Sequence, residues 1–171
     1  MKKQAFNTNW QFHLGDFEGA RWGVPAPRHW QTVDLPHDWS ISLDRDPQNI
    51  SGVAGGFFPM GRGWYHKHFT PSPEWQGKRV FIEFEGVYMN AETWLNGHLL
   101  GRHPYGYTSF HYDLSPYLDW SGPNLLKVLV DNAHQLNSRW YSGSGIYRPV
   151  WLMVAEPVHI AHWGVYVTTP E

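Results

Sequence analysis

The side chains best suited to contact a ligand gather in one polar, aromatic and glycine-containing stretch, residues 137–145. Arg139 offers a planar fork of N–H donors that suits sugar hydroxyls or a carboxylate. Trp140 and Tyr141 offer ring faces on which a sugar can stack, and the glycines allow close backbone approach. A structural alternative stays open, in which Arg139 pairs with a local aspartate and Trp140 plugs the end of the fold.

A second group of candidates follows a short predicted strand, in the sequence Pro-His-Asp-Trp at 36–39. Asp38 could accept hydrogen bonds from sugar hydroxyls, or it could cap backbone N–H groups in a turn, which is the commoner use of aspartate there. His37 could titrate near neutral pH. Because the chain has 11 histidines, His37 alone is weak evidence for a site. For Arg148, at the start of a strand, we expect a structural role that bonds loop carbonyls or a buried carboxylate.

Two other pairs of side chains have the residue types that catalysis or metal binding uses. Glu83 and Glu85 lie two apart on a predicted strand, on a face that we expect to be solvated, so they do not make a convincing catalytic pair. His66 and His68 share a strand face but lack a third metal ligand nearby. We therefore predict no catalytic residue, no metal site and no cofactor in this chain.

The sequence predicts that short β-strands position the candidate ligand-contact residues. Long apolar stripes of helical period are absent, and runs rich in β-formers alternate with glycine, proline, asparagine and aspartate. We expect strands at 79–85, 108–114, 124–130 and 147–154, and a hairpin at 93–100 whose Asn-Gly tip suits a type I′ turn. This spacing predicts an all-β fold, a jelly-roll β-sandwich with little helix.

One long segment does not read as a strand. Residues 44–63 contain five glycines and two prolines, with Phe-Phe-Pro near the middle. Loops of this length are usually functional or disordered, and the apolar residues favour an ordered surface loop.

Composition bounds the class of protein. The 171 residues suit one domain, and a formal net charge of −2 without a basic stripe argues against nucleic acid as a partner. The chain has no cysteine, 11 tryptophans, 9 tyrosines and 9 phenylalanines, so some rings should reach the surface. No run is long enough to span a membrane, and a cytoplasmic location is expected if Met1 is the native start.

Four segments, taken in order, carry a resemblance to a known family. They are 34–40 (DLPHDWS), 61–69 (GRGWYHKHF), 84–87 (FEGV) with 92–98 (ETWLNGH), and 138–150 (SRWYSGSGIYRPV). Together they resemble the N-terminal domain of glycoside hydrolase family 2, over about residues 8–157. The first and last segments look most like members of the β-galactosidase type, and β-glucuronidase and β-mannosidase stay open as alternatives.

The resemblance implies a galactose-binding-domain-like jelly roll, followed in the whole enzyme by an immunoglobulin-like domain and a TIM barrel. It also implies that the barrel supplies both catalytic glutamates of a retaining enzyme. This chain is then a non-catalytic carbohydrate-binding domain whose partners are a β-linked galactoside and the other domains. The substrate-contact candidates are Arg139, Asp38, Trp140, Tyr141 and His37. An autonomous carbohydrate-binding module or lectin, and a purely structural spacer, stay open.

Pro157 is the predicted domain boundary. We expect the jelly roll at 1–157, and 158–171 as a last strand or the start of a following immunoglobulin-like domain. Alternation of apolar residues predicts a strand at 158–169.

Overall fold

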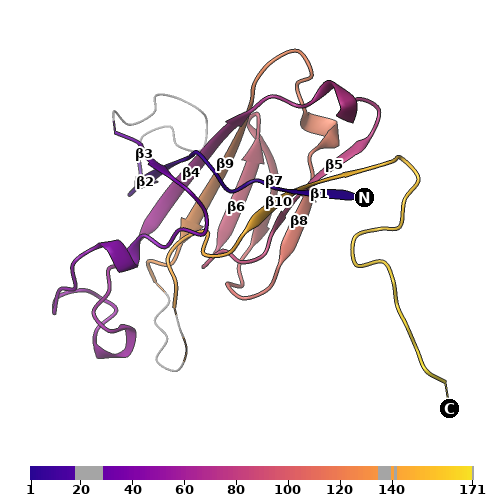
Figure 1. Ribbon diagram of the computed structural model, residues 1–171. Helices are drawn as coiled ribbons and strands as arrows, with labels where there is room; N and C mark the ends of the chain where they lie inside the picture. The colour runs from indigo at the N-terminus through magenta and orange to yellow at the C-terminus, as the bar shows by residue number, and fades with distance from the viewer. Residues whose placement is uncertain (18–28, 135–139, 141, 171) are drawn as a thin grey trace.

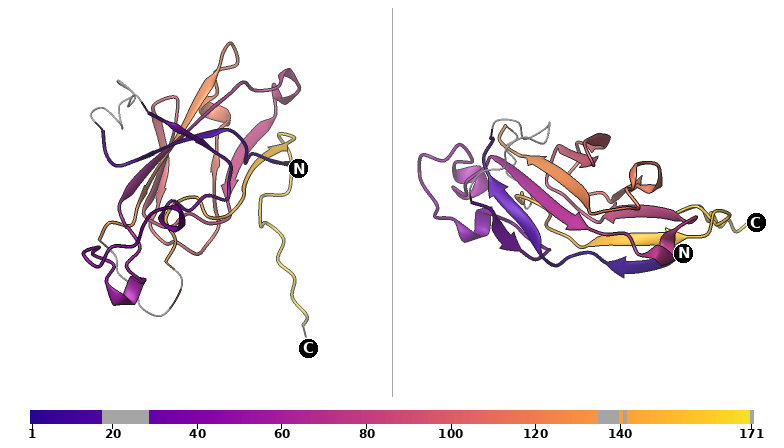
Figure 2. Two further views of the ribbon diagram at one scale, coloured as in Figure 1. Left: turned by 60° about the vertical axis from the view of Figure 1, so that its left-hand side comes forward. Right: turned by 90° about the horizontal axis from the view of Figure 1, so that it is seen from above.

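The computed structural model describes residues 1–17, 29–134, 140 and 142–170, and it folds them into two antiparallel sheets that face each other (Figures 1 and 2). The helical content of these residues is four short 3-10 helices: η1 Ser40–Ser42, η2 Val53–Gly55, η3 Pro73–Trp75 and η4 Ser115–Tyr117. The predicted all-β sandwich with little helix is confirmed.

The smaller sheet has four strands in the order β1-β10-β5-β8. Their bounds are Lys2–Ala5 for β1, Val150–Ala155 for β10, Arg79–Phe84 for β5 and Phe110–Asp113 for β8. The central pair joins strands far apart in the chain, with Leu152 opposite Ile82. Both of these side chains point into the sandwich, because alternate residues of a strand face the same side.

The larger sheet has six strands in the order β3-β2-β4-β9-β6-β7. Their bounds are Gln31–Val33 for β3, Trp10–Leu14 for β2, Arg62–Phe69 for β4, Asn124–Asp131 for β9, Ala91–Leu95 for β6 and His98–His103 for β7. The β6–β7 hairpin turns at Asn96 and Gly97, whose φ angles of 51° and 85° are those that a type I′ turn requires. The predicted hairpin is therefore confirmed.

The core lies between the sheets and is rich in aromatic rings. Phe12 and Tyr65 come from the larger sheet and pack at 4.8 Å between ring centroids, and Trp39 stacks on Phe12 at 5.5 Å. Trp39 lies in the connection between β3 and β4, so this connection is fixed to the core by a fully buried ring. Burial of such large apolar side chains is the main stabilising contribution to the fold.

The segment after β10 differs from its prediction. Residues 158–170 form no strand, and most of their side chains are exposed. The alternation of apolar residues there misled the strand prediction, because no neighbouring strand pairs with this backbone. The assignment of 158–171 to a following domain stays a prediction.

Candidate functional site

Four connections meet at one end of the sandwich. They are 34–61 before β4, 85–90 between β5 and β6, 104–109 between β7 and β8, and the described residues of the connection between β9 and β10, which are 132–134, 140 and 142–149. Figure 1 shows the first of these as the purple loop that projects from the body. Backbone hydrogen bonds connect the described parts of these loops. Trp39 N–H donates to Ser144 O at 3.0 Å, and Tyr88 and Gly145 form an antiparallel β-bridge. The predicted ordered loop at 44–63 and the described part of the polar stretch, Trp140 and residues 142–145, therefore belong to the same end.

Gly145 shows why the polar stretch needs glycine. Its φ of +128° is one that L side chains rarely adopt, and a Cβ there would lie 2.3 Å from the Tyr65 hydroxyl oxygen. The loop thus packs its backbone directly on the core. This is a structural use of a glycine that the sequence suggested for ligand approach.

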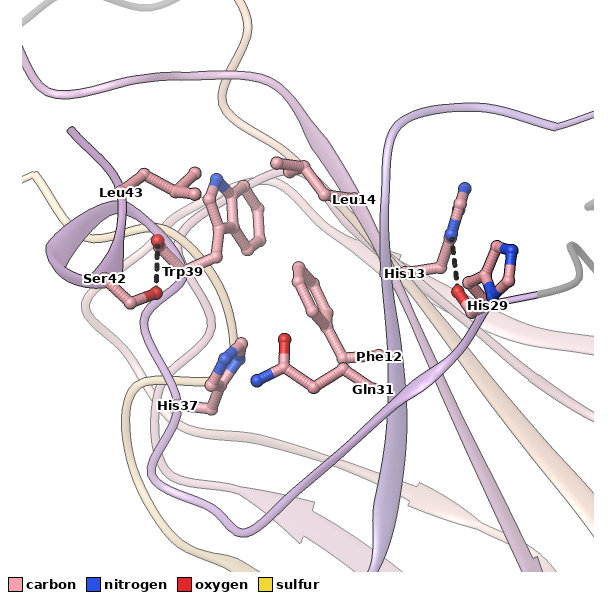
Figure 3. Close-up of a pocket in the computed structure, with 9 residues that line it drawn as sticks. All are labelled: Phe12, His13, Leu14, His29, Gln31, His37, Trp39, Ser42 and Leu43. Carbon is pink, nitrogen blue, oxygen red and sulfur yellow. Dashed lines mark hydrogen bonds between the residues drawn. The ribbon is translucent and has the colours of Figure 1, made fainter. Parts of the chain in front are cut away.

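His37 lines a pocket of about 180 Å³ at this end (Figure 3). Figure 3 shows the Gln31 amide beside the His37 ring, with the rings of Phe12 and Trp39 as an apolar wall. Nδ1 of His37 lies 2.8 Å from the Tyr65 hydroxyl, and Nε2 has no hydrogen-bond partner among the described residues. The pocket is lined by Phe12, His13, Leu14, His29, Gln31, His37, Trp39, Ser42 and Leu43.

Burial sets the charge of this pair. It lowers the pKa of His37, although the nearby Asp38 carboxylate raises that pKa in part. It also raises the pKa of Tyr65 well above its ordinary value. At neutral pH both groups are therefore uncharged, and the pocket offers hydrogen bonding next to ring faces, which suits a neutral polyol better than an ion.

Asp38 uses one carboxylate oxygen within its own turn. Its Oδ1 accepts from the Ser40 backbone N–H at 2.9 Å and from the Ser40 hydroxyl at 2.6 Å, and the side chain is 9% exposed. Of the two roles that the sequence left open, the turn-capping role is visible here. Direct contact of Asp38 with a sugar stays a prediction.

Trp140 borders a second pocket of about 210 Å³. Its ring is 56% exposed, so it does not plug the end of the sandwich. Phe58, from the loop before β4, lines the same pocket, and the Arg45 guanidinium lies 4.4 Å from the centre of its ring. The remaining lining residues are Ser40, Ile41, Ala54, Gly55 and Ser142.

Ser142 gives this second pocket an unsatisfied polar atom. Its hydroxyl oxygen is buried and has no hydrogen-bond partner among the described residues. A buried hydroxyl without a partner costs free energy that a ligand or another protein surface can recover. Of the other predicted site residues, Arg139 and Tyr141 lie outside the described residues.

Sequence reasoning missed several of the lining residues. Gln31, Trp39, Phe58 and Ser142 were not singled out as contacts. Trp39 and Ser142 do lie within the segments that carried the family resemblance, and Phe58 lies in the loop marked as functional by its length. Gln31 had no comparable signal, because its place in the pocket depends on the pairing of β3 with β2.

The face around Glu83 differs from its prediction. Glu83 is only 4% exposed, because Lys3 and His162 lie against its carboxylate at 2.7 and 3.0 Å. The predicted solvated face is therefore wrong at Glu83. One carboxylate oxygen of Glu83 forms an ion pair with Lys3 and the other contacts His162, while Glu85 Oε1 accepts from Trp151 Nε1–H at 2.7 Å. Both carboxylates are thus engaged in contacts within the sheet face.

His66 and Arg148 make contacts with neighbouring rings. His66 stacks on Trp30 at 4.2 Å, and the part of the chain that is described holds no group of three or more possible metal ligands. Arg148 is exposed and lies 5.3 Å from the Tyr147 ring centre, so the carbonyl or carboxylate contacts predicted for it are not those seen. In the same described ranges, no helix is long and apolar enough to cross a membrane.

Comparison with known proteins places this geometry in a family. The chain is 54% identical over 169 residues to a β-galactosidase of Bacteroides ovatus, BoGH2A, and 41% identical over 166 residues to a putative β-glucuronidase of Formosa agariphila. These alignments cover 98% and 97% of this chain but 20% and 16% of the two relatives. The chain thus spans about a fifth of the length of the curated relatives it matches.

Solved structures agree. A β-glycosidase from Bacteroides vulgatus matches with a TM-score of 0.87 and 47% identity, over 94% of this chain and 21% of that one. A glycosyl hydrolase family 2 member from Bacteroides cellulosilyticus matches with a TM-score of 0.89 and 40% identity, over 100% of this chain and 23% of that one. Residues 4–156 match the family described as glycosyl hydrolases family 2, sugar binding domain. The chain therefore belongs to glycosyl hydrolase family 2, as its sugar-binding β-sandwich domain.

Proposed function

We propose that this domain is a non-catalytic part of a retaining β-glycosidase and that its end loops contribute to a sugar subsite. The single observation that carries the proposal is the second pocket, where the exposed Trp140 ring lies near a Ser142 hydroxyl that has no hydrogen-bond partner among the described residues. A ring face packs against the C–H face of a sugar, and a hydroxyl without a partner can bond a sugar hydroxyl.

The pocket around His37 supports the same reading. The uncharged imidazole, the Gln31 amide and the Phe12 and Trp39 rings combine a few polar groups with apolar walls, which is the usual composition of a small-molecule site. Both pockets are smaller than the usual range of about 300–1,000 Å³ for ligand sites. Each is therefore suited to hold an edge of a sugar rather than to enclose it.

The remaining surface of the subsite would come from the rest of a longer polypeptide. Ile41 and Val53 at this end are 66% and 85% exposed, beside the exposed Trp140. Large apolar side chains gathered at one place favour contact with another protein surface. We assign that surface to the further domains of the glycosidase, a TIM barrel and an immunoglobulin-like domain, and we assign the catalytic carboxylates to the barrel.

The parent activity that we propose is β-galactosidase, because the relative with 54% identity has that activity in its name. A β-glucuronidase is the second candidate, since a relative with 41% identity carries that name.

A titration of the 171-residue chain tests the proposal. Amide NMR shifts would be followed while methyl β-galactoside, or methyl β-glucuronide in a second series, is added. We expect weak binding, of about millimolar Kd, because half of the subsite is missing and few contacts offset the entropy of association. The shifts should map to residues 37–58 and 142–146.

The matched variants are Trp140→Ala and Trp120→Ala. Trp120 is also exposed, at 39%, but it lies in the connection between η4 and β9, away from both pockets. Trp140→Ala should abolish the shifts and Trp120→Ala should preserve them. Equal loss in both variants, or shifts confined to another surface, would contradict the proposal. Micromolar affinity would instead indicate an autonomous lectin.

A further inference from the structure

A buried carboxylate on the outer face of the smaller sheet links three separate parts of the chain. Glu83 projects from β5 away from the core, yet it is only 4% exposed. Lys3 of β1 places its Nζ 2.7 Å from Oε2, and His162, from the segment after β10, places its Nε2 3.0 Å from Oε1. The Glu83 side chain thus contacts both β1, across the intervening strand β10, and the segment after β10.

The segment 156–163 lies across the outer face of its own sheet. The His159 ring lies 5.7 Å from Phe81, and the Trp163 ring lies 5.4 Å from His111. Met153, which pairs with Phe81 and therefore shares its face, is only 1% exposed. Figures 1 and 2 show this yellow segment beside β1 and β5 before the chain extends away.

The electrostatics of the contact centre on Glu83. Burial raises its pKa, but hydrogen bonds and charge from Lys3 and His162 outweigh burial and hold the pKa below its ordinary value. Burial and the neighbouring His162 lower the pKa of His111. The titratable and charged groups that face Glu83 are Lys3 from β1, Glu85 from β5, His111 from β8, and His162, with His159 on the same segment. From β10 the face receives Trp151 and Met153, which do not titrate.

We infer that residues 156–163 form a strap latched by His162 to Glu83, and that protonation of Glu83 releases the strap while the sandwich stays folded. The latch sets the direction in which the chain leaves the sandwich. The strap itself makes no strand pairing, so its attachment depends on side chains. The sandwich does not depend on the strap in the same way, because Ile82 and Phe84 of β5 pack on the other side of the sheet and the strand pairing is unaffected.

The direction of the pH effect follows from the depressed pKa of Glu83. Lys3 on β1 lowers the pKa of Glu83 whether or not the strap is attached, whereas His162 lowers it only in the attached state. The part of the depression that comes from His162 therefore stabilises the attached state at pH values above the ordinary pKa of about 4.5. That stabilisation is lost as the pH falls through the lower value. We therefore expect release only in acid, below the ordinary range of glutamate.

The experiment measures backbone order by ¹⁵N NMR relaxation on the 171-residue chain. At pH 7 the backbone order parameters of residues 158–163 should be about 0.85, as in the strands. His162→Ala should reduce these order parameters below about 0.6. The matched control is Glu85→Gln, which removes a neighbouring carboxylate on the same strand face and should leave the strap ordered. Unchanged order in His162→Ala would overturn the inference.

A pH series from 7 to 3 tests the release itself. In the wild type the strap should lose order before the amides of β9 lose their folded signals. In Glu83→Gln the order of the strap should not change over this range, whatever its value at pH 7. If strap and β9 change together in one transition, or if the wild-type strap stays ordered in acid, the latch is not Glu83 and the inference fails.

Discussion

The Tyr65 hydroxyl lies 2.8 Å from Nδ1 of His37, and this contact joins the core of the larger sheet to the loop that lines the first pocket. Tyr65 is fully buried in β4, while His37 borders the pocket. The ring of His37 is thereby held in one orientation by a group that no ligand can reach. The contact with buried Tyr65 therefore fixes the orientation of the His37 imidazole in the pocket.

Removing that hydroxyl tests the relationship. Tyr65→Phe leaves Nδ1 of a half-buried imidazole without its partner, and we expect a loss of about 1–2 kcal/mol in the free energy of unfolding. Denaturant unfolding measures the loss. The control is Tyr117→Phe, because Tyr117 is 39% exposed and its change should be within about 0.5 kcal/mol. Equal effects in the two variants would show that the contact contributes nothing specific.

His66 should make the fold sensitive to acid. Burial, with smaller contributions from Lys127 and His68, lowers the pKa of His66 to about 3. The unfolded chain therefore takes up a proton on this group below pH 6.5 that the folded chain does not, so stability falls as the pH falls from about 6.5 towards 3. The slope from one such group is at most about 1.4 kcal/mol per pH unit.

The measurement is denaturant unfolding at several pH values in His66→Gln. We expect the stability curve of this variant to be flatter than that of the wild type between pH 6.5 and 4, because glutamine does not titrate. His68→Gln is the control, since His68 is exposed on the same strand. If His68→Gln flattens the curve as much as His66→Gln does, the burial of His66 is not the cause.

Gly145 should tolerate no side chain. Gly145→Ala introduces a Cβ that meets the Tyr65 hydroxyl and forces an alanine to a φ of +128°, so we expect a loss of about 2–4 kcal/mol. Gly61→Ala, at the same end of the sandwich, is the control because a Cβ there meets nothing within 4 Å. Thermal melts of the two variants should differ clearly. A stable Gly145→Ala variant would show that the loop can move off the core.

Structural features that depend on neighbouring residues in the sequence could be predicted, whereas features that depend on contacts between distant residues could not. The β6–β7 hairpin was predictable because Asn-Gly supplies the two positive φ angles of its turn. The strands around β5, β8, β9 and β10 were predictable from short alternating runs. The buried Glu83 was not, because its cover comes from Lys3 and His162, 80 and 79 residues away in the chain. Alternation alone reports which face a residue points to and says nothing of what lies over it.

The candidate site divides in the same way. Trp140 could be singled out because its type and its loop both suggest a surface contact, and its exposure agrees. The turn-capping role of Asp38 was one of two options, and only the position of Ser40 distinguishes it. The Ser142 hydroxyl, which has no partner among the residues that the structure describes, has no signature in the sequence, because the surroundings of a serine cannot be read from its residue type.

Arg139 gives a prediction in the longer glycosidase that we propose. Arg139→Ala should lower kcat/KM about ten- to a hundredfold, which corresponds to the loss of a charged hydrogen bond of about 1.5–3 kcal/mol. Arg139→Lys should restore little of it, because a point charge does not reproduce the planar fork of donors. The melting temperature is measured on the same proteins. A kinetic loss that follows a large drop in melting temperature would make the role of Arg139 structural.

The most direct test of the proposed subsite compares two tryptophans in that longer enzyme. The value of kcat/KM for an aryl β-galactoside is measured in Trp140→Ala and Trp120→Ala, with melting temperatures recorded for both. If the Trp140 ring contributes about 1–2 kcal/mol of stacking to the transition state, Trp140→Ala should lower kcat/KM roughly five- to thirtyfold. Trp120→Ala should leave kcat/KM unchanged. Unchanged kcat/KM in a stably folded Trp140→Ala enzyme would contradict a sugar-contacting role for this end of the sandwich.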